Sequence, residues 1–513
     1  MSEKLFQSTA VVSVMTFISR ILGFLRDIVI ARLFGAGLGA DVFFVAFKIP
    51  NFLRRLFAEG AFSQAFIPVL AEYREQGDKP LKALIAQTSG TLAVILMLIT
   101  FVGMVAAPII IMIFAPGFIA DTYKLSLAGE LLRITFPYLL FISLTALAGS
   151  ILNSFGKFAV PAFTPVFLNL SLIGAAIWLS PQLEEPVTAL AWGVFIGGVV
   201  QLLFQLPFLL KINALPKPRW GWRSEGVRKI TRLMIPAMFG VSVSQINLLL
   251  DTLLASFLVT GSISWLYYSD RLVEFPLGVF GIALSTVILP SLSKKHAKQS
   301  DDSFSNTIDW ALRWVFIIGT PASIGLIALS QPLLTTLFQY GEFGADDAYQ
   351  ASLSLMAYGL GLLPFILIKV LAPGYYARQD TKTPVKIGII AMISNMILNV
   401  ILMIYLAHVG LALATGLSAA LNASLLYIGL RRRGVYTPNT GWATFALKLV
   451  LANGLMLGLL IWLTPDIASW QAWTAWQRFL QLISLIIGAA VSYFAVLSLL
   501  GIRLRQLIQP FKN

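Results

Sequence analysis

The sequence predicts an all-α polytopic membrane protein with about fourteen transmembrane helices. Hydrophobic residues make up 58% of the 513 residues, charged residues make up only 12%, and the mean hydropathy is +0.83. So few polar side chains cannot cover the core of a soluble protein of this length. Apolar runs of about 20 residues, enough to cross a hydrocarbon layer as helix, recur along the whole chain. Lipid is therefore the expected solvent for most of the surface.

The apolar runs end at charged residues or at breaks rich in proline and glycine, which set the expected helix boundaries. The expected ranges are 10–34, 41–72, 84–114, 127–152, 159–180, 187–210, 230–259, 265–291, 309–338, 348–371, 384–407, 409–431, 442–464 and 477–501. The second range contains Pro50, Arg54, Arg55 and Glu59, so we expect a broken helix beside a cavity. The N-terminal segment has no cleavage site of small residues, so we expect the first helix to be retained.

The lysines and arginines between the expected helices fall almost entirely on one side. That side holds Lys4, Arg74, Lys79, Lys82, Lys157, Lys211 to Arg232, Lys294, Lys295, Lys298, Arg378, Lys382, Arg431 to Arg433, Arg503, Arg505 and Lys512. The alternate loops hold Asp121, Lys124, Glu184, Glu185, Glu342, Asp346, Asp347, Asp466 and Arg478. The bias predicts that both termini are cytoplasmic. It also accounts for much of the +14 net charge, which favours contact with anionic membrane lipids and no nucleic acid partner.

An internal repeat is visible in the sequence. Four residues have a counterpart 222 positions later, pairing Gly39, Lys48, Ser63 and Pro68 with Gly261, Asp270, Ser285 and Pro290. We expect a duplication whose copies begin at the first and seventh helices, an even number of crossings apart, and therefore run parallel. The expected domains are an N-terminal lobe at 1–225, a C-terminal lobe at 226–435, and helices 13 and 14 at 436–513.

Charges interrupt the apolar stretches of the first seventy residues. A charge at the bilayer centre costs about 2.5–3.5 kcal/mol, so each should line a wet cavity, pair with a partner or lie at an interface. Asp41, Lys48 and Arg55 are spaced by seven and share one helical face, and Glu59 continues it. We expect a charged stripe that faces inward. The alternative is that these side chains lie at an interfacial end and extend to the membrane surface.

In the first helix, Asp27 lies on the same face as Arg20, so the two can form a neutral pair. Arg26 has no obvious local partner and can offer its guanidinium fork to a phosphate. A structural bridge between helices is the alternative.

The second copy has its own cluster, in which Arg271 can meet Glu274 one helical turn away. Such acidic groups can neutralise an arginine when no ligand is present. Lys369, within LPFILIKVLAPG, is a further isolated cation in an apolar run. Together these residues indicate an excess of positive charge and a pathway for an anion.

The sequence limits cofactor chemistry. It has no cysteine and two histidines, which excludes disulfides and cysteine-ligated metals. The candidate oxygen ligands for a sodium ion, or for a proton-accepting site, are Asp251, Asn395, Asn399 and Thr415. Asn395 and Asn399 are equally well explained as groups that hydrogen-bond between helices. No Walker loop, dinucleotide fingerprint or nucleophile elbow is present, so we expect no catalytic residue and no ATP hydrolysis.

The last two spans lie near four tryptophans, Trp462, Trp470, Trp473 and Trp476. Tryptophans gather where a membrane meets water. We therefore expect these four residues to form an interfacial belt.

Several long motifs resemble one known family. They are SRILGFLRD, FGAG, ADVFFVAFKIPNFLRRLFAEGAFSQAFIPVLAEY, SWLYYSDRLVEFPLGVFGIALSTVILPSLS and VLAPGYYARQDTKTPVKI. By these motifs the chain resembles the MurJ (MviN) family. That family belongs to the multidrug/oligosaccharidyl-lipid/polysaccharide exporter superfamily, and the resemblance covers essentially the whole chain.

The resemblance implies a flippase for lipid II, the undecaprenyl-pyrophosphate-linked precursor of peptidoglycan. It implies two parallel six-helix lobes around a central cavity, with two further helices forming a groove for the lipid tail. The implied substrate-binding residues are Arg20, Arg26, Asp41, Lys48, Arg54, Glu59, Arg271, Glu274 and Lys369. The arginines would hold the pyrophosphate, and the acidic residues would order or release them.

Some family members bind sodium, and the matching positions here are only approximate. Asn399 is neutral where an acidic ligand would be expected. We expect either no cofactor or coupling to a sodium ion or a proton.

The expected function is transport of lipid II by alternating access across the bacterial inner membrane. Anionic lipids and the cell-wall synthesis machinery are the expected partners besides lipid II itself. One alternative is a flippase for another prenyl-pyrophosphate glycan, and another is a scaffold that binds lipid II without moving it. A glycosyltransferase or polymerase would need a catalytic carboxylate or metal site, and the acidic loop residues show no such pattern.

Overall fold

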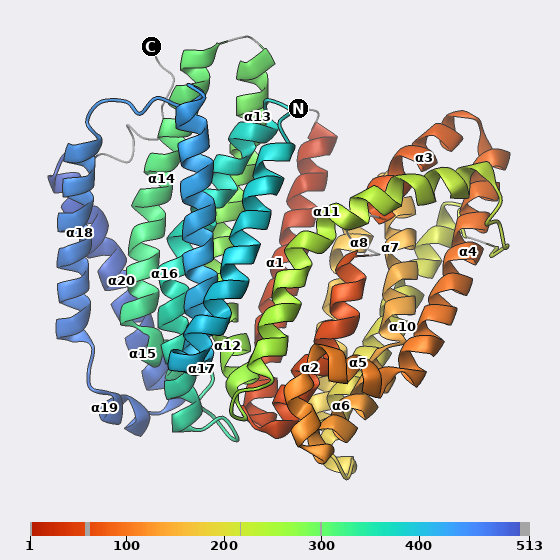
Figure 1. Ribbon diagram of the computed structural model, residues 1–513, viewed down its shortest axis with the longest axis horizontal. Coiled ribbons are helices and arrows are strands. Elements are labelled where there is room, and N and C mark those ends of the chain that lie inside the picture. The colour runs from red at the N-terminus through yellow and green to blue at the C-terminus, as the bar shows by residue number, and fades with distance from the viewer. Residues whose placement is uncertain (1–2, 57–61, 216, 298–299, 503–513) are drawn as a thin grey trace. The chain divides into compact units, whose positions relative to one another are not determined.

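The computed structural model describes residues 3–56, 62–215, 217–297 and 300–502, and helices dominate these segments (Figure 1). Within them the all-α prediction is confirmed. The chain divides into two compact units, residues 1–264 and 265–513, and each is described by itself.

The first unit contains the helices of the N-terminal half. Their bounds are α1 Glu3–Phe34, α2 Leu38–Arg54, α3 Ser63–Glu75, α4 Asp78–Val105, α5 Ala107–Phe114, η2 Pro116–Ala120, α6 Thr122–Thr135, α7 Tyr138–Ser154, α8 Ala159–Phe163, α9 Pro165–Gly174, η3 Ala175–Leu179, η4 Ser180–Gln182, α10 Thr188–Lys211 and α11 Glu225–Ala255. A core of aliphatic and aromatic residues, among them Phe66, Leu84, Ile151 and Ile230, joins α3, α4, α7 and α11. α1 packs on α8 and α9, and α10 packs on α7 and α9.

The second unit contains the remaining helices. Their bounds are α12 Ser262–Pro276, whose first turn belongs to the first unit, η5 Leu277–Gly281, α13 Ile282–Ala297, α14 Asp301–Ala328, α15 Ser330–Leu337, α16 Ala345–Tyr376, α17 Lys382–Arg432, α18 Trp442–Leu463, α19 Ile467–Ala472 and α20 Ala475–Leu499. α16 packs on α14 and α17, whereas α18 and α20 pack together on the other side of α14 (Figure 1). The predicted division at 225/226 and 435/436 stays a prediction, although α11 packs on α2, α3, α4 and α5.

Every expected range coincides with one or more of these helices. α17 accounts for two of them, because Ala407 has φ 48° and ψ −129° and interrupts the helix. A single helix of 51 residues would be about 76 Å long, more than twice a hydrocarbon core. A Cβ at Gly410 would lie 2.3 Å from the carbonyl oxygen of Leu402, so the chain turns back closely at this break.

Nine helical segments in the described part of the chain are long and apolar enough to cross a membrane. They make the protein a multi-pass membrane protein. The expected ranges that are not among them are 10–34, 41–72, 230–259 and 265–291, which are the first and second ranges of each proposed copy. Several of the predicted binding residues lie in these four ranges.

The broken second range recurs 222 residues later. α2 ends at Arg54 and α12 at Pro276, while α3 ends at Glu75 and α13 at Ala297. A π-helical segment follows each first half, at Arg55–Leu56 and at Leu277–Gly281. The helix continues through Pro50, so the break lies beyond the proline. These matching boundaries support the predicted duplication.

Arg478 ties three elements of the second unit together. Its buried guanidinium donates to the carbonyl oxygens of Thr335 at 3.3 Å, Gln339 at 3.3 Å, Trp470 at 3.0 Å and Gln471 at 2.7 Å. These carbonyls belong to the end of α15, the turn after it and α19. The predicted tryptophan belt is wrong for Trp470, which is fully buried and donates from Nε1 to the Thr336 hydroxyl at 2.9 Å.

Candidate functional site

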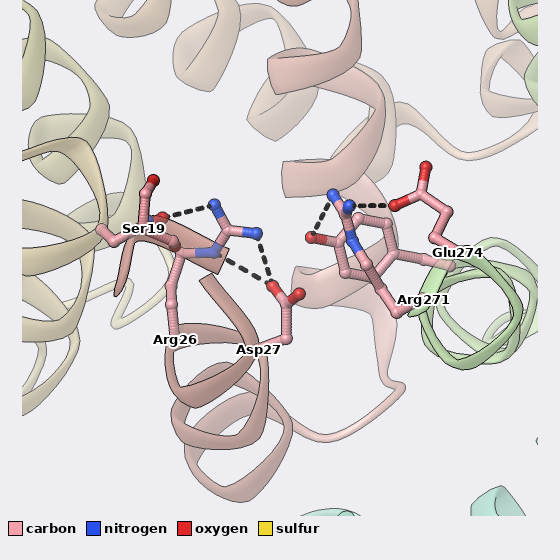
Figure 2. A network of polar contacts seen from close by, with 7 residues as sticks. Ser19, Arg26, Asp27, Arg271 and Glu274 are labelled. Carbon is pink, nitrogen blue, oxygen red and sulfur yellow. Dashed lines mark hydrogen bonds and ion pairs between the residues drawn. The ribbon is translucent and has the colours of Figure 1, made fainter. Parts of the chain in front are cut away.

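The first candidate cluster consists of Ser19, Arg26, Asp27 and Asn169, which we call the Arg26 cluster. Arg26 and Asp27 are buried on α1, with 8% and 1% of their surfaces exposed. Arg26 donates from Nε at 3.0 Å and from Nη2 at 2.6 Å to the same Asp27 oxygen, Oδ1 (Figure 2). On its other edge, Nη1 donates to Oδ1 of Asn169, on α9, at 3.0 Å.

Burial explains why Arg26 carries two partners, the carboxylate of Asp27 and the neutral amide of Asn169. A buried charge without compensation is expensive, and removal of one member of a buried ion pair typically costs about 3–5 kcal/mol. The expectation that Arg26 has no local partner is therefore wrong, because Asp27 neutralises it. The expected pairing of Asp27 with Arg20 is also wrong. Arg20 is exposed and has no hydrogen bond or ion pair to any residue that the structure describes.

The second cluster consists of Tyr267, Arg271 and Glu274 on α12, the Arg271 cluster. Arg271 donates from Nη1 to Oε2 of Glu274 at 2.7 Å and from Nη2 to the Tyr267 hydroxyl at 3.2 Å (Figure 2). The predicted pairing of Arg271 with Glu274 is confirmed. The side chains are 34% and 48% exposed. An exposed pair is worth only about 0–1 kcal/mol, so it can exchange partners at low cost.

The predicted stripe on α2 does not act as one unit. Asp41 is buried, and its oxygens accept from the backbone amides of Gly261 and Ser264 and from the Ser264 hydroxyl. It therefore caps the first turn of α12 rather than facing an arginine. Lys48 and Arg54 are half-buried, and Arg54 donates from Nε to Oδ1 of Asn51 at 2.9 Å. Glu59 lies outside the described residues.

Lys369 fits the description of an isolated cation. It is exposed on α16 and has no hydrogen bond or ion pair to another residue in the described ranges. A Cβ at Gly281, in the π-helical segment η5, would lie 3.7 Å from Cγ of Lys369. The lysine stem therefore passes beside the helix break of the second copy.

The predicted oxygen donors are divided between the two units. Asp251 lies on α11 in the first unit, whereas Asn395, Asn399 and Thr415 lie on α17 in the second. Both asparagines are fully buried, and the Thr415 hydroxyl donates to the Leu411 carbonyl of its own helix at 3.0 Å. The three donors in the second unit are neutral, so they offer no charge that would compensate a cation.

Two side chains of these clusters, those of Asn169 and Tyr267, were missed by the sequence reasoning. Asn169 lies in the run PVFLNLSLIG, where an amide amid apolar residues was the available signal. Tyr267 lies four residues before Arg271, a spacing that brings the two side chains together on a helix.

The comparisons with known proteins agree with one another. Residues 30–483 match the family model described as lipid II flippase MurJ. The chain is 56% identical to a probable lipid II flippase MurJ of Vibrio cholerae, over 99% of this chain and 98% of that protein. It is 43% identical to a lipid II flippase MurJ of Burkholderia cenocepacia, over 97% of this chain and 98% of the relative.

Solved structures give the same result. A lipid II flippase MurJ in an inward closed conformation aligns with a TM-score of 0.81 at 29% identity, covering 97% of this chain and 99% of that chain. A multidrug resistance MATE family transporter, in an inward-facing conformation, aligns with a TM-score of 0.69 at 13% identity, covering 83% and 98%. The second similarity concerns the fold alone. The chain belongs to the lipid II flippase MurJ family.

Proposed function

We propose that this protein moves lipid II from the cytoplasmic to the periplasmic leaflet of the bacterial inner membrane. Family membership and the names of its relatives support this substrate. We further propose that it acts as a transporter without catalytic residues, with both termini in the cytoplasm, as the lysine and arginine bias predicts.

The observation that carries the proposal is the pairing of arginines with carboxylates. The Arg26 cluster and the Arg271 cluster each hold a guanidinium against a carboxylate of its own helix, Arg26 against Asp27 and Arg271 against Glu274. A pyrophosphate matches the guanidinium fork in the same bidentate way as a carboxylate. The exposed Glu274 is the partner that a phosphate group can replace at low cost, whereas the buried Arg26 stays paired with Asp27.

The remaining predicted cations extend this role. In the proposal Arg20, Lys48, Arg54 and Lys369 attract the anionic headgroup, while Glu59, Glu274 and Asp41 order the cations or the helices that carry them. The two lobes rock in alternating access around the headgroup, and differential affinity for it shifts the states. An inward-negative potential assists outward movement of an anion by about 2.3 kcal/mol per charge per 100 mV.

Other partners follow from the same proposal. The cytoplasmic lysines and arginines contact anionic lipid headgroups, and the two C-terminal helices α18 and α20 guide the prenyl tail. The periplasmic product supplies the cell-wall synthesis machinery.

The test is depletion of the protein in its host, followed by digestion with a protease or toxin that cleaves only externally exposed lipid II. Wild type and the control Arg431→Ala, an exposed residue at the end of α17, should restore exposure. Arg26→Ala and Arg271→Ala should not. Unchanged exposure after depletion would overturn the proposal in favour of a scaffold. Loss of surface polysaccharide with an intact cell wall would indicate another prenyl-pyrophosphate glycan.

A further inference from the structure

Asn169 is a buried amide whose position on α9 has no explanation in packing alone. It lies among apolar neighbours with 6% of its surface exposed. Asparagine is a poor residue for a helix interior, and a buried amide is costly unless it is hydrogen-bonded. Its partners therefore indicate its role.

Both ends of the amide bind α1. Oδ1 accepts from Nη1 of Arg26 at 3.0 Å, and Nδ2 donates to the carbonyl oxygen of Ser19 at 3.1 Å. Ser19 and Arg26 are seven residues apart, so they lie on one face of the helix. A flipped amide would place its NH₂ group against the guanidinium and its oxygen against a carbonyl. The surroundings consequently fix the amide in one orientation.

The amide and the carboxylate hold opposite edges of the same guanidinium. Asp27 accepts from Nε and Nη2, while Asn169 accepts from Nη1. The ion pair alone leaves the guanidinium plane able to turn about a single acceptor oxygen. A second acceptor on the other edge defines the plane, because guanidinium hydrogen bonds lie within it.

Gly23 lets Asn169 lie close to α1. A Cβ at Gly23 would lie 3.7 Å from Nδ2 and 3.8 Å from Oδ1 of Asn169. These are ordinary van der Waals distances, so an alanine fits here, whereas a longer side chain would take the space of the amide.

We propose that Asn169 is a positioning residue for Arg26, which sets the direction in which the guanidinium meets the diphosphate of the substrate. The inference rests on the proposed function. Asn169 acts through Arg26 and does not itself touch the substrate. Because an amide is neutral, it orients the guanidinium without the net negative charge that a second carboxylate beside Asp27 would bring and that would repel an anion.

The test measures binding of lipid II to the full-length protein in nanodiscs, together with thermal unfolding. Asn169→Leu should weaken binding about tenfold, since a hydrogen bond to a charged group is lost. The matched control is Gln205→Leu, because Gln205 is a buried amide of the same unit that donates to the Thr164 hydroxyl at 2.8 Å. Its binding should stay within about twofold of wild type.

A double-mutant cycle separates positioning from a general structural effect. Arg26→Lys keeps the charge and removes the fork, so adding Asn169→Leu to it should weaken binding no further. Gln205→Leu should have the same small effect in both backgrounds. If Asn169→Leu does not fold, Asn169→Ser serves instead, because a hydroxyl is too short to reach both Arg26 and Ser19.

The outcomes distinguish the two proposals. Equal losses from Asn169→Leu with arginine or lysine at position 26, or no loss at all, would overturn the positioning role and leave the flippase proposal intact. If wild-type protein binds no lipid II, the proposed function itself fails. Weakened binding that vanishes in the Arg26→Lys background supports the positioning role.

Discussion

Asp41 holds Ser264 through two hydrogen bonds to one carboxylate oxygen, from the backbone amide at 2.9 Å and from the hydroxyl at 2.6 Å. Its other oxygen accepts from the amide of Gly261 at 2.7 Å, where the backbone has φ +101°. A side chain of α2 therefore accepts hydrogen bonds from amides at the start of α12 that have no acceptor within their own helix. In the sequence, Asp41 and Ser264 are 223 residues apart. Such amides need a partner when they are buried.

Asp41→Ala should destabilise the protein by about 2–3 kcal/mol, because it leaves buried donors without acceptors. Ser264→Ala should cost only about 1 kcal/mol, because it removes one neutral donor and leaves both backbone bonds. Thermal unfolding in detergent measures both. Asp346→Ala, an exposed acid in the first turn of α16, is the control for loss of charge. Equal effects at positions 41 and 264 would contradict the capping role.

Asp309→Ala should release the segment between α17 and α18. The Oδ1 atom of Asp309 accepts from the Tyr436 hydroxyl, the Asn439 amide and the Trp442 indole, at 2.9, 3.1 and 2.7 Å. Oδ2 accepts from Nε of Arg313 at 2.9 Å. Loss of a buried carboxylate with these partners should lower the free energy of unfolding by about 3–5 kcal/mol. Limited proteolysis should then cleave the variant faster than wild type within residues 433–441.

The matched control for Asp309 is Asn306→Ala. Asn306 accepts a hydrogen bond from the Asn439 side chain at 3.0 Å, in an exposed position. Its removal should change stability by less than about 1 kcal/mol. Cleavage in 433–441 that is equally fast in both variants would refute the assignment of Asp309 as the anchor.

Asp380→Asn should remove a stabilisation that depends on pH. Hydrogen bonds from Thr383 and from Arg433 lower the pKa of Asp380 from 3.8 to about 2. A carboxyl group whose pKa is lower in the folded state stabilises fully above the unfolded value and loses this effect as pH falls towards the folded value. The difference in melting temperature between wild type and variant should therefore shrink from pH 4 to pH 2. A constant difference across that range would rule out this linkage.

Transport should not require sodium. The predicted donors on α17, Asn395, Asn399 and Thr415, are neutral and supply no charge to compensate a cation. Lipid II exposure should be the same when sodium is replaced by choline at constant ionic strength. If replacing sodium strongly lowers lipid II exposure in wild type but has no further effect in Asn399→Ala, these residues are sodium ligands.

Much of the fold could be predicted because membrane insertion is recorded locally. An apolar run and its charged ends depend on neighbours in the chain, so 384–407 and 409–431 were separated correctly around Ala407. The close match of helix ends in α2 and α12 likewise follows from a repeat that the sequence displays.

The site was harder to predict because its partners are distant in sequence. Arg26 meets Asn169 across 143 residues, and no spacing rule connects them. Asp41 shares a helical face with Lys48, yet it serves another helix, because a buried carboxylate takes whichever donors the packing provides. Trp470 follows the composition of an interfacial residue but lies in the core, since a partner for its indole is available there.

Four backbone carbonyls surround the guanidinium of Arg478, and we call them the carbonyl cage. The cage limits how this part of the sequence can change during evolution. All four of its acceptors are main-chain oxygens, which every amino acid possesses. The contact therefore depends on the path of the backbone and not on which side chains lie along it. Sequence drift at positions 335, 339 and 471 should leave the cage intact, whereas a one-residue insertion or deletion between Thr335 and Gln339, or between Trp470 and Arg478, should break it. Such a contact constrains the number of residues between its members, whereas the amino acids at those positions can change.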